Sequence, residues 1–180
     1  MKIHRSLLAC FACGALLCTP VFAARRHGHS HPSHSFTAQD FLDTAAQEQM
    51  LQAHLATMVT KHSADVGVRH FGTQISDQTT NDYRKLAMIA SKLNMTLPKG
   101  IDKEGNGTIS KLGKLYRGGF DRAFVDEEAA SIQREVGAFQ SASQSAQNPA
   151  LKQYAATELP KLKLSYQETK DFAHYHLKAK

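Results

Sequence analysis

Four histidines near the N-terminus are the residues whose type and spacing point most directly to chemistry. Residues 25–35 read RRHGHSHPSHS and contain His27, His29, His31 and His34. Imidazoles at alternating positions of a flexible segment can converge on Cu(II), Ni(II) or Zn(II). Because nothing in this polar segment orders the ligands in advance, we expect any bound metal to exchange. The alternative is a solvated leader that spaces the folded part of the chain from the export machinery.

Residues 1–23 predict a secretory signal peptide. Lys2 and Arg5 precede an apolar run over 7–17, and the segment ends Val-Phe-Ala, with small residues at the positions that a signal peptidase reads. The apolar run is too short to span a bilayer comfortably, which disfavours a retained membrane anchor. We therefore expect cleavage after Ala23, no membrane span in the mature protein, and a periplasmic location, with release from the cell as an alternative.

Charge, cysteines and motifs exclude several classes of function. All three cysteines lie within residues 1–23, so we expect the mature chain to have no disulfide, thiolate ligand or cysteine nucleophile. Removing Lys2 and Arg5 lowers the formal net charge from +6 to +4, and this excess is spread along the chain, which disfavours a nucleic-acid partner. There is no Gly-rich phosphate loop and no readable Ser-His-Asp set. We expect no catalytic residues and no cofactor other than exchangeable metal at the histidines.

Apolar residues at helical spacing predict four long helices that must position any site. The expected helices cover residues 37–61, 64–94, 120–146 and 149–177, and the third begins with the clearest stripe, FDRAFVDEEAASIQREVGAF at 120–139. Thr37 with Asp40 resembles a capping box at the first helix. Pro149 suits the first position of the last helix, whereas Pro160 should kink it. Nothing in the sequence indicates a strand.

The helices predict an all-α four-helix bundle with a long central connection. Residues 95–110 contain Pro98 and three glycines, which indicates a loop, and a short helical piece is expected over 111–117 before Gly118 and Gly119 break the chain. A calcium loop starting at Asp102 is the weaker alternative, because its twelfth position is Gly113 rather than Glu. The predicted organisation is a signal peptide at 1–23, a His-rich leader at 24–36 and one domain at 37–180.

A layer of uncharged polar residues interrupts the apolar stripes. Gln52, Gln78 and Ser165 each stand within one stripe, and Ile132 occupies the comparable place on the third expected helix. Bundles that bind two metals carry Glu and Glu-x-x-His ligands at such places, and this chain contains no Glu-x-x-His. We expect these three residues to form a hydrogen-bonded core layer that fixes helix register. Paired carboxylates such as Glu127 and Glu128 are expected on a solvated face.

Four segments carry a family resemblance: FLDTAAQEQM at 41–50, FGTQISDQ at 71–78, FDRAFVDEEAASIQ at 120–133 and ATELPKLKLS at 156–165. Over about residues 38–177 the chain resembles the domain of unknown function 4142 family, exported bacterial proteins with a ferritin-like bundle. The resemblance implies a ferritin-like fold. It also implies Glu at position 52, Asp-His at 77–78, and His at 132 and 165. The chain departs from that pattern with Gln52, Gln78, Ile132 and Ser165, so a family metal or proton site is expected to be lost.

These observations favour an exported, non-enzymatic bundle protein that acts through an envelope protein or surface. The first alternative is binding or buffering of Cu, Ni or Zn by the His-rich leader. The second is a ferritin-like metal oxidase, which the missing Glu-x-x-His motifs and the four departures disfavour.

Overall fold

In the part of the chain that the structure describes, short polar side chains cap every α-helix except the one that begins at Gly118. A computed structural model describes residues 36–177. It contains α1 (Ala38–His62), α2 (Val66–Lys92), α3 (Lys103–Leu112), α4 (Gly118–Ser145) and α5 (Pro149–Phe172), and the last helix continues into a π-helical turn, η1 (Ala173–Leu177). No strand occurs within the described range. No helix in that range is both long enough and apolar enough to cross a membrane.

The helix starts follow the capping chemistry of the sequence. Thr37 Oγ1 accepts a hydrogen bond from the backbone N–H of Asp40 at 3.0 Å, as expected for α1. Asp65 caps α2 in the same way, and Asn148 caps α5 with Pro149 at its first turn. These oxygens satisfy N–H groups that have no partner inside their own helix. The observed bounds of the four long helices lie close to the predicted ones.

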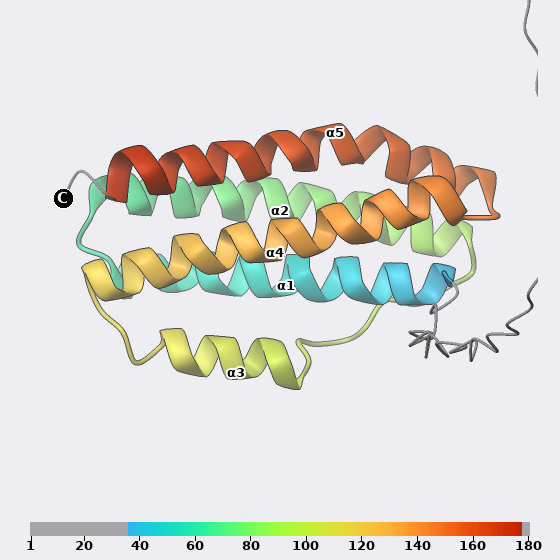
Figure 1. The fold of residues 1–180 in the computed structure, drawn as a ribbon. Coiled ribbons are helices and arrows are strands. Elements are labelled where there is room, and N and C mark those ends of the chain that lie inside the picture. Colours follow the sequence, from blue (N-terminus) through green and yellow to red (C-terminus); the bar gives the residue numbers. More distant parts are fainter. Residues whose placement is uncertain (1–35, 178–180) are drawn as a thin grey trace, which may run out of the picture. The chain divides into compact units, whose positions relative to one another are not determined.

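The four long helices form a bundle in which α1 packs against α2 and α4, and α4 packs against α5. Figure 1 shows these helices side by side, with the shorter α3 lying outside the bundle next to α1 and α4. By contrast, α2 and α5 approach each other at few points. The prediction of an all-α bundle is confirmed, and the weakly packed α2–α5 side is the place where a groove forms.

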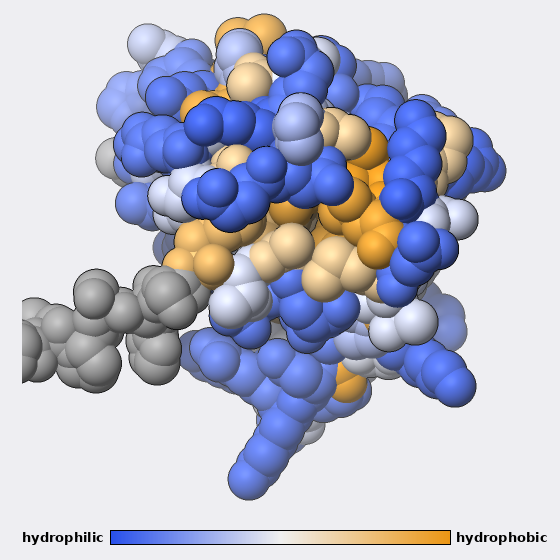
Figure 2. All heavy atoms as spheres, turned by 90° about the vertical axis from the view of Figure 1, so that its right-hand side faces the viewer, coloured by the Kyte–Doolittle hydropathy of each residue, from blue (hydrophilic) through white to orange (hydrophobic). Residues whose placement is uncertain are grey.

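Two apolar clusters fill the interior at different levels of the bundle. One includes Phe41, Leu86 and Phe139, and the other includes Leu55 and Phe124. The rings of Phe41 and Phe139 meet edge to face with centroids 4.9 Å apart. Along α1, α2 and α4 most of the buried polar residues, among them Gln49, Thr79 and Glu135, come between the two clusters. Figure 2 shows the bundle from the end where α4 gives way to α5, with apolar side chains framed by polar ones.

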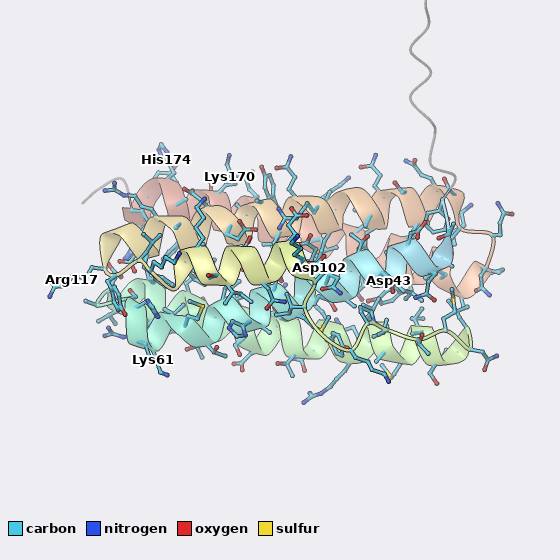
Figure 3. The ribbon with its side chains drawn as sticks, turned by 90° about the horizontal axis from the view of Figure 1, so that it is seen from below. Asp43, Lys61, Asp102, Arg117, Lys170 and His174 are labelled. Carbon is cyan, nitrogen blue, oxygen red and sulfur yellow. The ribbon has the colours of Figure 1, made fainter. Side chains whose placement is uncertain are left out.

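The predicted loop is confirmed over 95–102 but is wrong beyond it, and the short helix predicted over 111–117 lies earlier, because α3 covers residues 103–112. Asp102 caps this helix by accepting a hydrogen bond from the N–H of Gly105 at 2.8 Å. Figure 3 shows Asp102 at the end of the connection that leads into α3. Gly105 is buried, and a Cβ there would lie 2.5 Å from a methyl carbon of Ile101. Gly105 is therefore needed for close packing against Ile101 rather than for a turn.

The calcium-loop alternative for this segment is excluded by the helix itself. Asp102 is committed to the cap, and the Asn106 side chain donates to the backbone oxygens of Ile101 and Asp102, each at 2.7 Å. A helix over 103–112 also cannot wrap its side chains around one ion as a calcium-binding loop does. After α3 the chain turns at Arg117, which has a φ of 52°, and α4 then starts at Gly118. The expected break thus falls at Arg117, one residue ahead of the two glycines.

Pro160 lies within α5 without ending it, since the helix runs from Pro149 to Phe172. Figure 1 shows the ribbon of α5 bending about midway along its length. Proline removes one backbone donor and crowds the preceding turn, which bends a helix at such a position.

Candidate functional site

Two glutamates of α4 lie in the bundle interior, between the two apolar clusters. Glu128 is 1% exposed and Glu135 is 2% exposed. Residues seven apart share a helix face, so both carboxyls point to the same side of α4. The expectation that Glu128 belongs to a solvated face is wrong. A sequence signal did exist, because Asp121, Glu128 and Glu135 recur at steps of seven within the apolar stripe and all three are buried.

Glu135 and Gln52 form the centre of a buried hydrogen-bond network. Gln49 Nε2 donates to Glu135 Oε1 at 3.1 Å, and Gln52 Nε2 donates to Glu135 Oε2 at 2.9 Å. Gln52 Nε2 also donates to Ser131 Oγ at 3.0 Å, and Gln52 Oε1 accepts from Thr79 Oγ1 at 3.3 Å. One glutamine of α1 therefore makes hydrogen bonds to α2 and to two positions of α4.

The network reaches the surface at a cluster of charges. Ser131 Oγ donates to Glu48 Oε2 at 2.6 Å, and Arg134 binds both oxygens of Glu48, at 2.6 and 2.9 Å. Arg134 also donates to Glu127 at 2.8 Å, and its bonds to Glu48 are the main reason that its pKa is raised. This guanidinium neutralises carboxylates at the rim and makes no hydrogen bond to Glu128.

Glu128 differs from Glu135 in its hydrogen bonding. Neither carboxyl oxygen of Glu128 has a hydrogen-bond partner among residues 36–177, and the same holds for Gln49 Oε1. Burial raises the pKa of Glu128 from its ordinary 4.5 to about 8, with a further contribution from the nearby charge of Glu135. Burial also raises the pKa of Glu135 to about 8, against the opposing effect of hydrogen bonds from Gln52 and Gln49. Burial therefore favours the protonated form of both carboxyls.

These residues surround a small cavity, which we call the chamber. Its volume is about 20 Å³, enough for one water-sized group, and it is lined by residues of α1, α2, α4 and α5. Glu128, Glu135 and Gln49 are among the lining residues. The four positions at which the chain departs from the resembled pattern (52, 78, 132 and 165) also all line the chamber.

A larger surface groove adjoins the chamber on the α2–α5 side. The groove has a volume of about 270 Å³. Four residues line both spaces, namely Gln49, Gln78, Asp82 and Leu162. Within the groove, Lys85 binds Asp82 at 2.7 Å and Glu158 at 3.4 Å, and Asp82 is the main cause of the raised pKa of Lys85. The groove therefore leads from a charged surface to the wall of the chamber.

The residues of the predicted polar layer divide into two hydrogen-bonded groups. Gln78 Nε2 donates to Ser165 Oγ at 3.0 Å, in an exposed bond that joins α2 to α5. Gln52 instead bonds to Thr79, Ser131 and Glu135 in the interior. The three predicted residues thus line one chamber, but their hydrogen bonds form no single layer.

The predicted metal site at His27, His29, His31 and His34 lies outside the described residues and stays a prediction. Within 36–177 no group of three or more His, Cys, Asp or Glu side chains is arranged to hold a metal ion. His62 Nδ1 donates a 2.7 Å hydrogen bond to the carbonyl oxygen of Leu115, and its imidazole stacks on Phe120. His176 lies 2.8 Å from Asp65. His62 therefore connects the end of α1 to the segment before α4, and His176 connects η1 to the start of α2.

The fold and its interior define an all-α bundle protein with a buried carboxyl and amide cluster. The family model of the domain of unknown function DUF4142 matches residues 23–172, and the chain belongs to this family. A solved structure of a DUF305 protein from Streptomyces coelicolor, named as a candidate secreted protein, has a similar fold with a TM-score of 0.61 at 12% identity. The alignment covers 74% of this chain and 88% of that one. The search of curated proteins found no match.

Proposed function

We propose that this chain is an exported, non-enzymatic bundle protein that acts in the periplasm through an envelope protein or surface. Export is supported by the features of residues 1–23 and, by analogy, by the name of the DUF305 neighbour as a candidate secreted protein. In this proposal the interior polar residues serve the fold rather than a reaction.

The hydrogen bonds of Gln52 are the observation that supports a structural role for the interior polar residues. They join α1 to α2 through Thr79 and α1 to α4 through Ser131 and Glu135. A slip of one helix by a turn would leave these buried donors and acceptors without partners, at a cost of about 1–3 kcal/mol for each group. Such a network favours one helix register over its neighbours.

Metal content and localisation test this proposal together. Cell fractionation should recover a mature chain that begins after Ala23 in the periplasm. In purified, untagged mature protein, replacing Gln78 with Leu should leave metal content unchanged and alter only stability. Bound metal that disappears in Gln78→Leu would show that the interior is a metal centre and would overturn the proposal. A di-iron absorption together with oxidation of Fe(II) would favour the oxidase alternative instead.

A second candidate function, buffering of Cu, Ni or Zn, is favoured by the alternating histidines of residues 25–35. Titration of Cu(II), Ni(II) and Zn(II) into the mature protein and into a version lacking residues 25–34 tests it. Binding that is present in the first and absent in the second assigns the metal to the histidines. Equal binding by both versions would exclude them as its ligands.

A further inference from the structure

The chamber presents unpartnered acceptor atoms. Both oxygens of Glu128 and Oε1 of Gln49 lack hydrogen-bond partners among the described residues, and all are buried. The amide nitrogens that border them donate to another carboxyl, since Gln49 Nε2 and Gln52 Nε2 both donate to Glu135. A buried acceptor without a donor is costly, so the complementary ligand is a donor group.

An ammonium group fits this arrangement. It presents three N–H donors and no acceptor. Its positive charge would balance ionised Glu128, whereas Arg134 is bound to Glu48 and Glu127 at the rim, away from this carboxyl. Glu135, Glu127 and Glu48 are the carboxyls whose charges act on Glu128, and Asp82, which is paired with Lys85, lines the chamber from α2. The volume of about 20 Å³ admits one group of this size.

The adjoining groove can hold the remainder of such a ligand. It shares four lining residues with the chamber, so the two spaces are neighbours that lie against the same side chains. Phe139, Tyr154 and Leu162 provide apolar surface within it. Lys85 is held by Asp82 and Glu158, which neutralise its charge at the groove wall. The chamber and the groove together fit a ligand with a small charged group attached to an apolar chain.

We propose that this chain binds a primary alkylammonium compound, with its ammonium group in the chamber against Glu128 and Gln49 and its carbon chain in the groove between α2 and α5. The site holds the ligand reversibly and breaks no bond in it. A metal ion is the less suitable occupant, because no group of three acidic, histidine or cysteine ligands faces a common point in the described range.

Titration with n-butylamine, followed by chemical shifts of backbone and glutamine amides in full-length mature protein, tests this inference. Shifts should saturate and concentrate on α4, α2 and α5 around the chamber. 1-Butanol, which has the same chain without the charge, should bind at least about tenfold more weakly, since hydrogen bonds to charged groups are the stronger ones. Equal shifts from both compounds would reduce the site to an apolar groove and overturn the inference.

Matched variants locate the ammonium group. Glu128→Gln should weaken butylamine binding by about tenfold or more, because the buried counter-charge is lost. Asp126→Asn removes one charge from an exposed position of the same helix and should change binding by no more than about twofold. Unaltered binding by a folded Glu128→Gln protein would contradict the inference. If Glu128→Gln does not fold, Ser165→Leu, which adds bulk where Ser165 lines the chamber, should weaken binding instead.

The pH profile and metal competition provide further readouts. Because burial raises the pKa of Glu128 to about 8, binding should strengthen from pH 6 to pH 9, while an alkylamine with a pKa near 10.4 stays charged. Binding that is independent of pH over this range would argue against ionised Glu128 as the partner. Displacement of butylamine by Mg²⁺ or Ca²⁺ at the same amides would make the chamber a metal site and would also overturn the inference.

Discussion

The side-chain amide of Gln52 lies 2.9 Å from Glu135 and joins α1 to α4 in the middle of the bundle. The two residues are 83 positions apart in the sequence. Gln52 holds one carboxyl oxygen of Glu135 while Gln49 holds the other, so the glutamate is oriented from α1 on both sides. Seven residues earlier on the same helix, Glu128 receives no such support within the described range. Two equally buried carboxyls on one face of α4 therefore differ in their hydrogen bonding.

Stability should fall as pH rises from about 5 to about 8. Glu128 and Glu135 have pKa values of about 8 in the folded chain, against an ordinary value of 4.5. Between these values the folded state binds more protons than the unfolded state, so each unit of rising pH lowers the free energy of unfolding. Urea denaturation at pH 5, 7 and 9 measures the effect. Glu128→Gln lacks one of these two titrating groups, so its free energy of unfolding minus that of the wild type should increase between pH 5 and pH 8. A difference that stays constant with pH would contradict a raised pKa for Glu128.

Gln52→Leu should destabilise the bundle by about 1–3 kcal/mol, because Glu135 loses a donor and Thr79 loses an acceptor in the interior. Gln78→Leu is the matched control, since its hydrogen bond to Ser165 is exposed, and it should cost about 1 kcal/mol or less. Chemical denaturation at one pH compares the two. Equal costs would show that the interior network contributes no more than the surface pair.

Phe124→Ala should lower the free energy of unfolding by about 3–5 kcal/mol. Phe124 is fully buried, and its ring lies 5.9 Å from that of Phe120 and 6.1 Å from that of Phe71, so truncation leaves a cavity that these rings cannot fill. Leu164→Ala provides the control, because Leu164 is 60% exposed, and its effect should stay within about 0.5 kcal/mol. Thermal or urea unfolding followed by circular dichroism is sufficient. A small loss for Phe124→Ala would mean that the cluster repacks.

Asp102→Ala should loosen α3 while leaving the four long helices in place. The substitution removes the oxygen that accepts from Gly105, and lost caps cost about 0.5–2 kcal/mol. Because α3 is a short helix outside the bundle, the cost should appear as local opening, with faster amide hydrogen exchange over 103–112. Asp126→Asn, an exposed change on α4, should leave this exchange unaltered. Unchanged exchange in Asp102→Ala would show that packing alone holds α3.

The fold could be predicted because the long helices carry apolar stripes at helical spacing, and three of the four begin at a recognisable cap. The position of α3 could not, because Gly105 and Gly107 lower helix propensity, and only the packed structure shows that Gly105 allows close contact with Ile101. The interior position of Gln52 could be predicted because an uncharged polar residue is conspicuous within an apolar stripe. Glu128 was missed because charged side chains are seldom fully buried, which makes a solvated face the natural interpretation of a Glu-Glu pair.

The course of the chain through α3 has a consequence for assembly. Figure 1 shows α3 carrying the chain back along the bundle, so that α1 with α2 forms one hairpin and α4 with α5 forms another. Gln52 and Thr79 belong to the first hairpin, and Glu128, Glu135 and Ser165 belong to the second. Neither half can complete the chamber alone. A chain cut between α2 and α4 would therefore serve as a complementation reporter, in which burial of Glu128 signals that two separately made halves have joined.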